Sequence, residues 1–78
     1  MTTIRGIVIP AVWNEKGEIV SVAIATYHEE TYRVAEGAAG QRLLSLLKKR
    51  VVVDGMVSRQ GIHRTIDVKN VEIDKTTP

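Results

Sequence analysis

The sequence predicts a mainly β domain, a five-stranded antiparallel barrel with one α-helix between the third and fourth strands. Three observations lead to this fold class. Stretches rich in β-branched residues alternate between more and less apolar sides, as half-buried strands do. Short turn sequences with glycine or charged residues separate these stretches. One leucine-rich segment contains no β-branched residue and repeats at helical spacing instead.

The length and composition fit one small domain. We expect residues 1–78 to form a single domain, with its core within residues 4–73 and a tail at residues 74–78. Hydrophobic residues make up 44% of the chain and most are aliphatic, which is enough for one core. The net charge of +2 is ordinary for a soluble domain and does not by itself indicate a polyanionic partner.

Several classes of protein are disfavoured by the composition. The chain has no cysteine, which rules out a disulfide framework, a thiolate zinc site and a cysteine nucleophile. It does not begin with a basic segment followed by a long apolar run, as secretory signals do. Its apolar runs are only a few residues long, whereas a membrane span needs about 20. We therefore expect a cytoplasmic protein with no membrane contact.

The first two strands are expected at residues 4–13 and 18–27. Pro10 lies inside the first strand and cannot donate a ladder hydrogen bond, so it implies an edge position, a bulge or a bend. Residues 14–17 form a turn in which Gly17 supplies a positive φ. The more apolar side of the second strand is expected to face the core. That side carries Val20, Val22, Ile24 and Thr26.

A third strand is expected at residues 31–35, followed by a helix within residues 36–49. Four apolar residues recur at helical spacing and predict one buried stripe: Ala39, Leu43, Leu46 and Leu47. The cations Lys48, Lys49 and Arg50 follow, where they favour the negative end of the helix dipole.

The last two strands are expected at residues 51–57 and 65–73, with a loop at residues 58–64. Gly55 interrupts the valine-rich fourth strand and indicates a sharp bend or a close backbone approach. The apolar alternation of the fifth strand changes phase after Val68, and one extra residue near Asn70, a bulge, restores a single core face.

The order of elements, with one helix after the third strand, resembles the OB-fold. Residues 49–57, then Gly61 and residues 65–68, resemble the last two strands of small bacterial single-domain OB-fold proteins. The resemblance spans residues 4–73. It implies a ligand surface on the second and third strands, rimmed by the loops at residues 14–18 and 58–64. These two loops are short, whereas OB-fold proteins that bind long single strands often have longer and more basic loops.

Single-stranded nucleic acid is the ligand that this resemblance favours. Such binding needs cations for phosphates and rings on which bases stack. The candidate binding residues are Trp13, Tyr27, Tyr32, Arg33, Arg59, Arg64 and Lys69, with Arg5 as a further phosphate partner. Glu29 and Glu30 lie between the two tyrosines and would repel phosphate there.

Each of these candidates also has a structural interpretation. The three rings can cover the ends of an aliphatic core, with their polar atoms reaching water. The arginines on either side of Gly61 can clamp a phosphate through forked hydrogen bonds, or they can be the solvated tip of a hairpin.

Catalysis is not expected. The two histidines, His28 and His63, lie on different turns, and no nucleophile–base pair, metal motif or cofactor motif is present in the sequence. The alternative to nucleic-acid binding is a protein–protein interaction or oligomerisation module, with a homodimer as one form. Ala23 and Ala25 would then form a flat exposed strip on the second strand, and Ile62 would be an exposed apolar residue in an otherwise polar loop.

Overall fold

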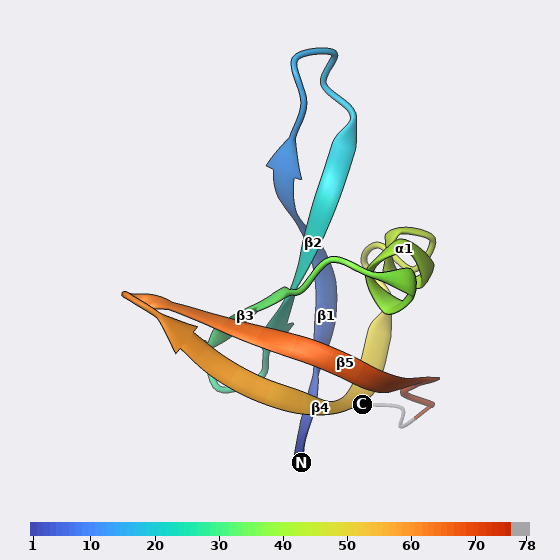
Figure 1. Ribbon diagram of the computed structural model, residues 1–78. Helices are drawn as coiled ribbons and strands as arrows, with labels where there is room; N and C mark the ends of the chain where they lie inside the picture. The colour runs from blue at the N-terminus through green and yellow to red at the C-terminus, as the bar shows by residue number, and fades with distance from the viewer. Residues whose placement is uncertain (76–78) are drawn as a thin grey trace.

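The computed structural model describes residues 1–75, apart from the side chain of Gln60 (Figure 1). Five strands and one helix follow one another in the predicted order, with the helix between the third and fourth strands. They are β1 (Thr2–Trp13), β2 (Ile19–Thr26), β3 (Thr31–Val34), α1 (Ala38–Leu44), β4 (Arg50–Gln60) and β5 (His63–Ile73).

The strands form one closed, ring-like sheet in the order β1-β2-β3-β5-β4, and β4 also pairs with β1. β1 pairs with β4 through its first half and with β2 through its second half. β3 and β5 are parallel, so the prediction of an entirely antiparallel sheet is wrong at this pair. The reason is that α1 and β4 lie between these two strands in the sequence, and a connection of this length permits parallel pairing.

The interior of the closed sheet is aliphatic, as the composition predicts. The largest completely buried side chains are Val8, Val22, Ile24, Leu43, Val51, Val53 and Ile66. Leu43 comes from α1, which packs against β2 and β5. The other members of the predicted stripe, Ala39, Leu46 and Leu47, pack against the same core while remaining partly exposed. The leucine-rich segment therefore covers the core as expected.

The helix is shorter than the sequence predicts, and it ends at Leu44. Lys48 adopts a left-handed backbone conformation with φ 66°, which an α-helix does not contain. The backbone of this segment bonds to β1 instead. The Lys48 N–H donates to the Val8 carbonyl at 2.8 Å, and the Val8 N–H donates to the Lys49 carbonyl at 3.1 Å. Tertiary pairing with Val8 therefore replaces the last helical turn.

Irregularities occur in β1 and β5 where the sequence predicts them. Pro10 pairs with Val22 while Val12 pairs with Ser21, so β1 has an extra residue just after the proline. Asp54 pairs with Asn70 while Gly55 pairs with Val68, so β5 has an extra residue just before Asn70. Both features are β-bulges, which bend a strand and increase its twist.

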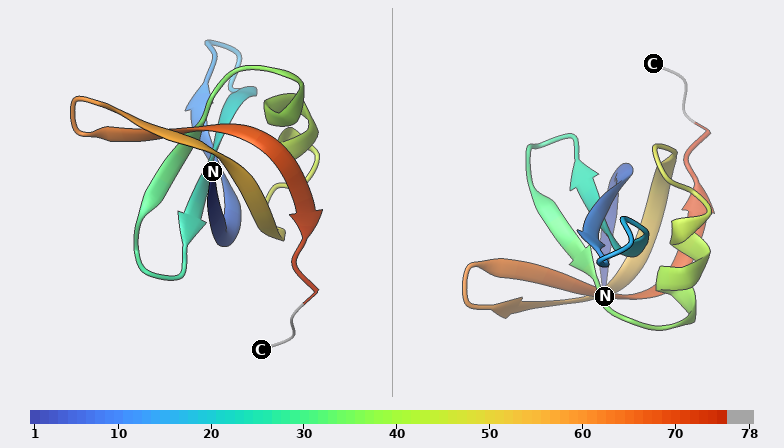
Figure 2. Two further views of the ribbon diagram at one scale, coloured as in Figure 1. Left: turned by 60° about the horizontal axis from the view of Figure 1, so that its bottom comes forward. Right: turned by 90° about the horizontal axis from the view of Figure 1, so that it is seen from above.

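Two hairpins extend beyond the closed ring (Figures 1 and 2). The predicted loop at residues 58–64 is wrong, because β4 continues to Gln60, β5 begins at His63, and only Gly61 and Ile62 form the turn. Val20 is predicted to face the core but is 51% exposed. It lies in the β1–β2 hairpin, beyond the part of β2 that pairs with β3.

The pairing of β4 with β5 continues slightly past β5. The Asp74 N–H donates to the Arg50 carbonyl at 2.9 Å. Residues 76–78 of the tail expected from the sequence lie outside the described residues.

Candidate functional site

The strand register divides β1, β2 and β3 into an inward side and an outward side. Val8 pairs with Ile24, and both are completely buried inside the ring. Successive side chains of a strand point to opposite faces, so the residues next to them point outward. We call the following residues the outward face: Thr3, Arg5, Ile7, Ile9, Ala23, Ala25, Thr31 and Arg33.

Arginines lie across this face and at its edge. Arg33 is exposed and stands between Ala23 on β2 and Thr65 on β5. Arg5 is exposed on β1, and the exposed Arg50 on β4 is the register partner of Ile7. None of the outward-face residues named above is acidic. The surface is therefore positively charged.

The floor of the outward face is made of small side chains. Ala23 is 2% exposed and Ala25 is half-buried, so the expected exposed alanine strip is wrong. Ala23 pairs with Ile9 on one side and Arg33 on the other. Cross-strand neighbours lie on the same face, so these larger side chains flank the Ala23 methyl group. The alanines form a recessed floor rather than a protruding strip.

Tyr27 lies at one end of the outward face and is 52% exposed. It lines an open pocket of about 310 Å³ between the start of β1 and the β2–β3 turn. The pocket residues are Thr3, Ile4, Arg5, Thr26, Tyr27, His28, Glu30 and Tyr32. A ring and an arginine are thus adjacent, as nucleotide binding requires, while Asp54 adjoins the same end by accepting a hydrogen bond from Thr3.

Tyr32 has a different environment from Tyr27. It pairs with Ile24 and packs against the core, so it covers one end of the aliphatic interior. Its hydroxyl donates a hydrogen bond to Glu30 Oε2 at 3.0 Å. That bond, together with burial and the Glu30 charge, raises the pKa of the Tyr32 hydroxyl, because an ionised hydroxyl has no proton to donate. Of the two interpretations of Tyr32, its contacts support the structural one.

Arg64 completes a cluster with Glu30 and Tyr32. Its Nη1 lies 3.0 Å from Glu30 Oε2, the oxygen that also accepts from Tyr32. Its guanidinium carbon lies 5.9 Å from the centre of the Tyr32 ring, within cation–π range. Glu30 therefore does not stand as an isolated negative charge beside the tyrosines, because Arg64 neutralises it.

Arg59 stands directly opposite Arg64 in the β4–β5 hairpin. Register partners share a face, so both arginines point to the side of the hairpin where Tyr32 lies. Arg59 is exposed, and within residues 1–75 no carboxylate lies within ion-pair distance of it. The sequence-predicted residues Tyr32, Arg59 and Arg64 are thus brought together at one end of the ring.

Trp13 and Lys69 lie apart from both groups. Trp13 is 55% exposed near the tip of the β1–β2 hairpin, where it pairs with Ile19. Lys69 lies at the β5 bulge and pairs with Asp67 at 3.1 Å. It also lines a depression beside α1 together with Arg42. The structure does not join these two residues to the outward face.

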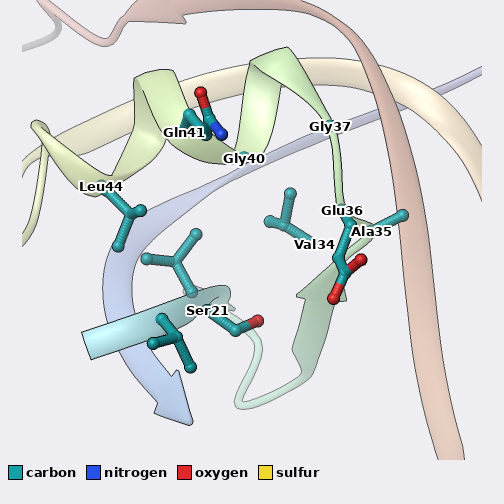
Figure 3. Close-up of a pocket in the computed structure, with 10 residues that line it drawn as sticks. Ser21, Val34, Ala35, Glu36, Gly37, Gly40, Gln41 and Leu44 are labelled. Atoms are coloured by element: carbon teal, nitrogen blue, oxygen red, sulfur yellow. The ribbon is translucent and has the colours of Figure 1, made fainter. Parts of the chain in front are cut away.

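A second hollow, of about 290 Å³, lies between β2 and α1 (Figure 3). Val34 and Leu44 approach it from β3 and α1, and Val20 and Ser21 line it from β2. Its only charged lining residue is Glu36. This hollow has no cation to attract a phosphate.

No family model matches the chain, and neither a curated protein nor a solved structure matches it. Across the part of the chain that the structure describes, no helix is long and apolar enough to cross a membrane. Within the same residues, no three histidine or acidic side chains converge as a metal site would require. The candidate sites are therefore the two surfaces that carry arginines: the outward face, and the end of the ring where Arg59 and Arg64 lie.

Two residues of these surfaces have other roles in the structure than the sequence predicts. The sequence places Arg50 at the end of the helix, but Arg50 begins β4 and borders the outward face. The sequence predicts that Glu30 repels phosphate, but Glu30 is the ion-pair partner of Arg64. Strand alternation from Val51 could have placed Arg50 outward. No local signal could have paired Glu30 with Arg64.

Proposed function

We propose that this domain is an OB-fold barrel that binds single-stranded nucleic acid along its outward face. The strand order β1-β2-β3-β5-β4, the parallel β3–β5 pair and the helix between β3 and β4 support the fold. Barrels of this kind bind oligonucleotides on strands two and three, between the β1–β2 and β4–β5 loops.

The observation that carries the proposal is the combination of one exposed ring with several arginines on a face whose own residues include no acid, although Asp54 borders one end of it. Arg5, Arg33 and Arg50 are exposed on or beside the outward face, and Tyr27 is exposed at its end. Arginines contact phosphates through forked hydrogen bonds, and a tyrosine ring stacks on any base.

This chemistry predicts weak and sequence-tolerant binding. Phosphate contacts position a strand but carry no sequence information, and stacking accepts every base. A single exposed tyrosine contributes about 1–3 kcal/mol of binding free energy. Three phosphate contacts correspond to a slope of about −2 for log affinity against log salt concentration.

Fluorescence anisotropy with a labelled oligothymidine tests the proposal. We expect binding at low salt that weakens with the stated slope, and Tyr27→Ala should weaken it by about fivefold or more. Arg33→Gln should also weaken binding and reduce the salt slope. Lys69→Gln is the matched control, because it removes the same charge from a residue paired with Asp67. No binding by the wild type at low salt would exclude the proposal.

A second candidate function is self-association through the β1–β2 hairpin. Val12, Trp13 and Val20 of this hairpin are all substantially exposed. Exposed large apolar side chains on a projecting hairpin can be covered by a second copy of the chain. Sedimentation velocity tests it: a concentration-dependent dimer that Trp13→Ser abolishes would support it, and a monomer at high protein concentration would exclude it.

A further inference from the structure

We infer that Arg59 and Arg64 form a clamp for a phosphate monoester, the terminal phosphate of a bound strand. The two arginines lie on the side of the β4–β5 hairpin that faces the β2–β3 turn, where Glu30 and Tyr32 hold Arg64. The terminal-phosphate part of this inference rests on the proposed function, whereas the clamp itself depends only on the four residues.

Two like charges stand opposite each other in the β4–β5 hairpin. Arg59 and Arg64 are direct cross-strand partners, and like charges in that arrangement destabilise a hairpin. Figure 2 shows that this hairpin projects beyond the ring. Glu30 of the β2–β3 turn compensates Arg64, whereas Arg59 has no carboxylate partner within residues 1–75. A bound anion that contacts both guanidiniums would remove the repulsion.

Arg64 is already held in position before a ligand binds. Glu30 bonds one of its terminal nitrogens, and the Tyr32 ring lies beneath its guanidinium. A guanidinium has five N–H donors, so the Glu30 bond leaves others free for a ligand. Fixing one arginine before binding reduces the conformational entropy that ligand binding must overcome.

A phosphate monoester offers two arginines more acceptor atoms than a diester does. Arg59 has no carboxylate partner within the described residues, and Arg64 keeps N–H donors beyond the one that Glu30 accepts. A phosphate monoester has three terminal oxygens. A diester within a strand has only two such oxygens. Two forked donors are therefore better satisfied by the monoester.

The position of the clamp explains why the end of a strand would reach it. Arg33 and Tyr32 are consecutive, so their side chains point to opposite sides of β3. Arg33 belongs to the outward face, while Tyr32 and Arg64 lie at the end of the ring. A strand that follows the outward face can turn its terminus towards the clamp without its other nucleotides leaving the sheet.

Oligothymidines that differ only in a terminal phosphate test this inference. The strands carry a 5′-phosphate, a 3′-phosphate or hydroxyls at both ends, with the fluorophore at an internal position. We expect one of the two phosphorylated strands, the 5′ or the 3′ form, to bind at least about fivefold more tightly than the strand with hydroxyls at both ends. This ratio corresponds to about 1 kcal/mol. Arg59→Gln should abolish the difference, and Arg59→Lys should reduce it because lysine lacks the fork. Lys69→Gln should leave it unchanged.

A second measurement separates the clamp from the proposed function. Inorganic phosphate is added to the isotopically labelled protein, and the side-chain resonances of Arg59 and Arg64 are followed by NMR. Shifts that Arg59→Gln removes support the clamp, even if no oligonucleotide binds, and then indicate a site for free phosphate or a small monoester. Equal binding of all strands together with no phosphate-induced shifts would overturn the clamp and leave the proposed function standing.

Discussion

Arg64 on β5 and Glu30 in the β2–β3 turn are 34 residues apart in the sequence, and their side chains form an ion pair of 3.0 Å. The pair connects the projecting β4–β5 hairpin to the turn beside the pocket of Tyr27. Tyr32 adds a hydrogen bond to the same carboxylate and a ring face to the same guanidinium. Side chains from β3 and β5 therefore meet at the carboxylate of Glu30 in the β2–β3 turn.

The Glu30–Arg64 pair should make a small, salt-sensitive contribution to stability. Both side chains are partly exposed, and exposed ion pairs contribute about 0.2–1 kcal/mol. A double-mutant cycle with Glu30→Gln and Arg64→Gln, measured by urea unfolding, should give a coupling energy in this range at low salt. The coupling should shrink at 1 M salt, because counterions screen the charges. A coupling that salt leaves unchanged would contradict an electrostatic origin.

The hydrogen bond from Tyr32 to Glu30 should make stability depend on pH in the alkaline range. It raises the pKa of Tyr32 above the ordinary value of 10.0, so the folded state holds this proton more tightly than the unfolded chain does. The stabilisation is complete below pH 10 and is lost as the pH rises through the raised pKa.

Unfolding at several pH values checks this expectation. The stability difference between the wild type and Tyr32→Phe should be constant from pH 7 to 9 and should decline above about pH 10. Glu30→Gln serves as the control, because without the carboxylate the decline should be weaker. A stability difference that grows as the pH rises above 10 would show that folding does not raise the pKa of Tyr32.

Gly55 should not tolerate a side chain. A Cβ at this position would overlap the Asp67 carbonyl oxygen and lie 2.9 Å from Ile66 Cγ1. Both belong to β5 directly beside the bulge, so the backbone would have to move. We expect Gly55→Ala to lower the free energy of unfolding by about 1–3 kcal/mol. Ser58→Ala, at an exposed position of the same strand, should change it by less than about 0.5 kcal/mol.

Leu43 should be the most important residue of α1 for stability. It is the buried residue of the helix and is completely inaccessible to solvent. Leu43→Ala should lower the free energy of unfolding by about 2–5 kcal/mol, because it removes apolar contacts and leaves a cavity. Gln41→Ala, which is exposed in the same helix, is the control for helix propensity. Equal effects of the two substitutions would mean that the helix does not seal the core.

Local patterns in the sequence predicted most of the fold. The apolar alternation predicts all five strands, and the phase change after Val68 predicts the β5 bulge. Pro10 predicts an edge position, a bulge or a bend, and the structure has a bulge there. These signals are local, because a bulge or a turn depends on a few neighbouring residues. The end of the helix was not predictable in this way, since Val8 on β1 captures the backbone of Lys48.

The candidate site was less predictable than the fold. Alternation indicated that Tyr27 points away from the core, and it is exposed in the structure. The grouping of Arg59 and Arg64 with Glu30 depends on which strands become neighbours when the sheet closes. That neighbour relation joins residues far apart in the chain. Residue types and spacing alone do not encode it. The sequence therefore predicts Arg59 and Arg64 as site residues but does not predict that Glu30 pairs with Arg64.

The short β3 has a consequence for how the ring opens. Closure on the β5 side depends on three register pairs along a strand of four residues, whereas β4 and β5 form a much longer ladder. The chain must also loop through α1 and β4 before this contact exists, which makes it costly in entropy and late in folding. We therefore expect native-state hydrogen exchange to be faster for the amides of β3 than for those at the centre of β4. Transient loss of the β3–β5 pairing would leave an open sheet in the order β3-β2-β1-β4-β5, with its hairpins intact.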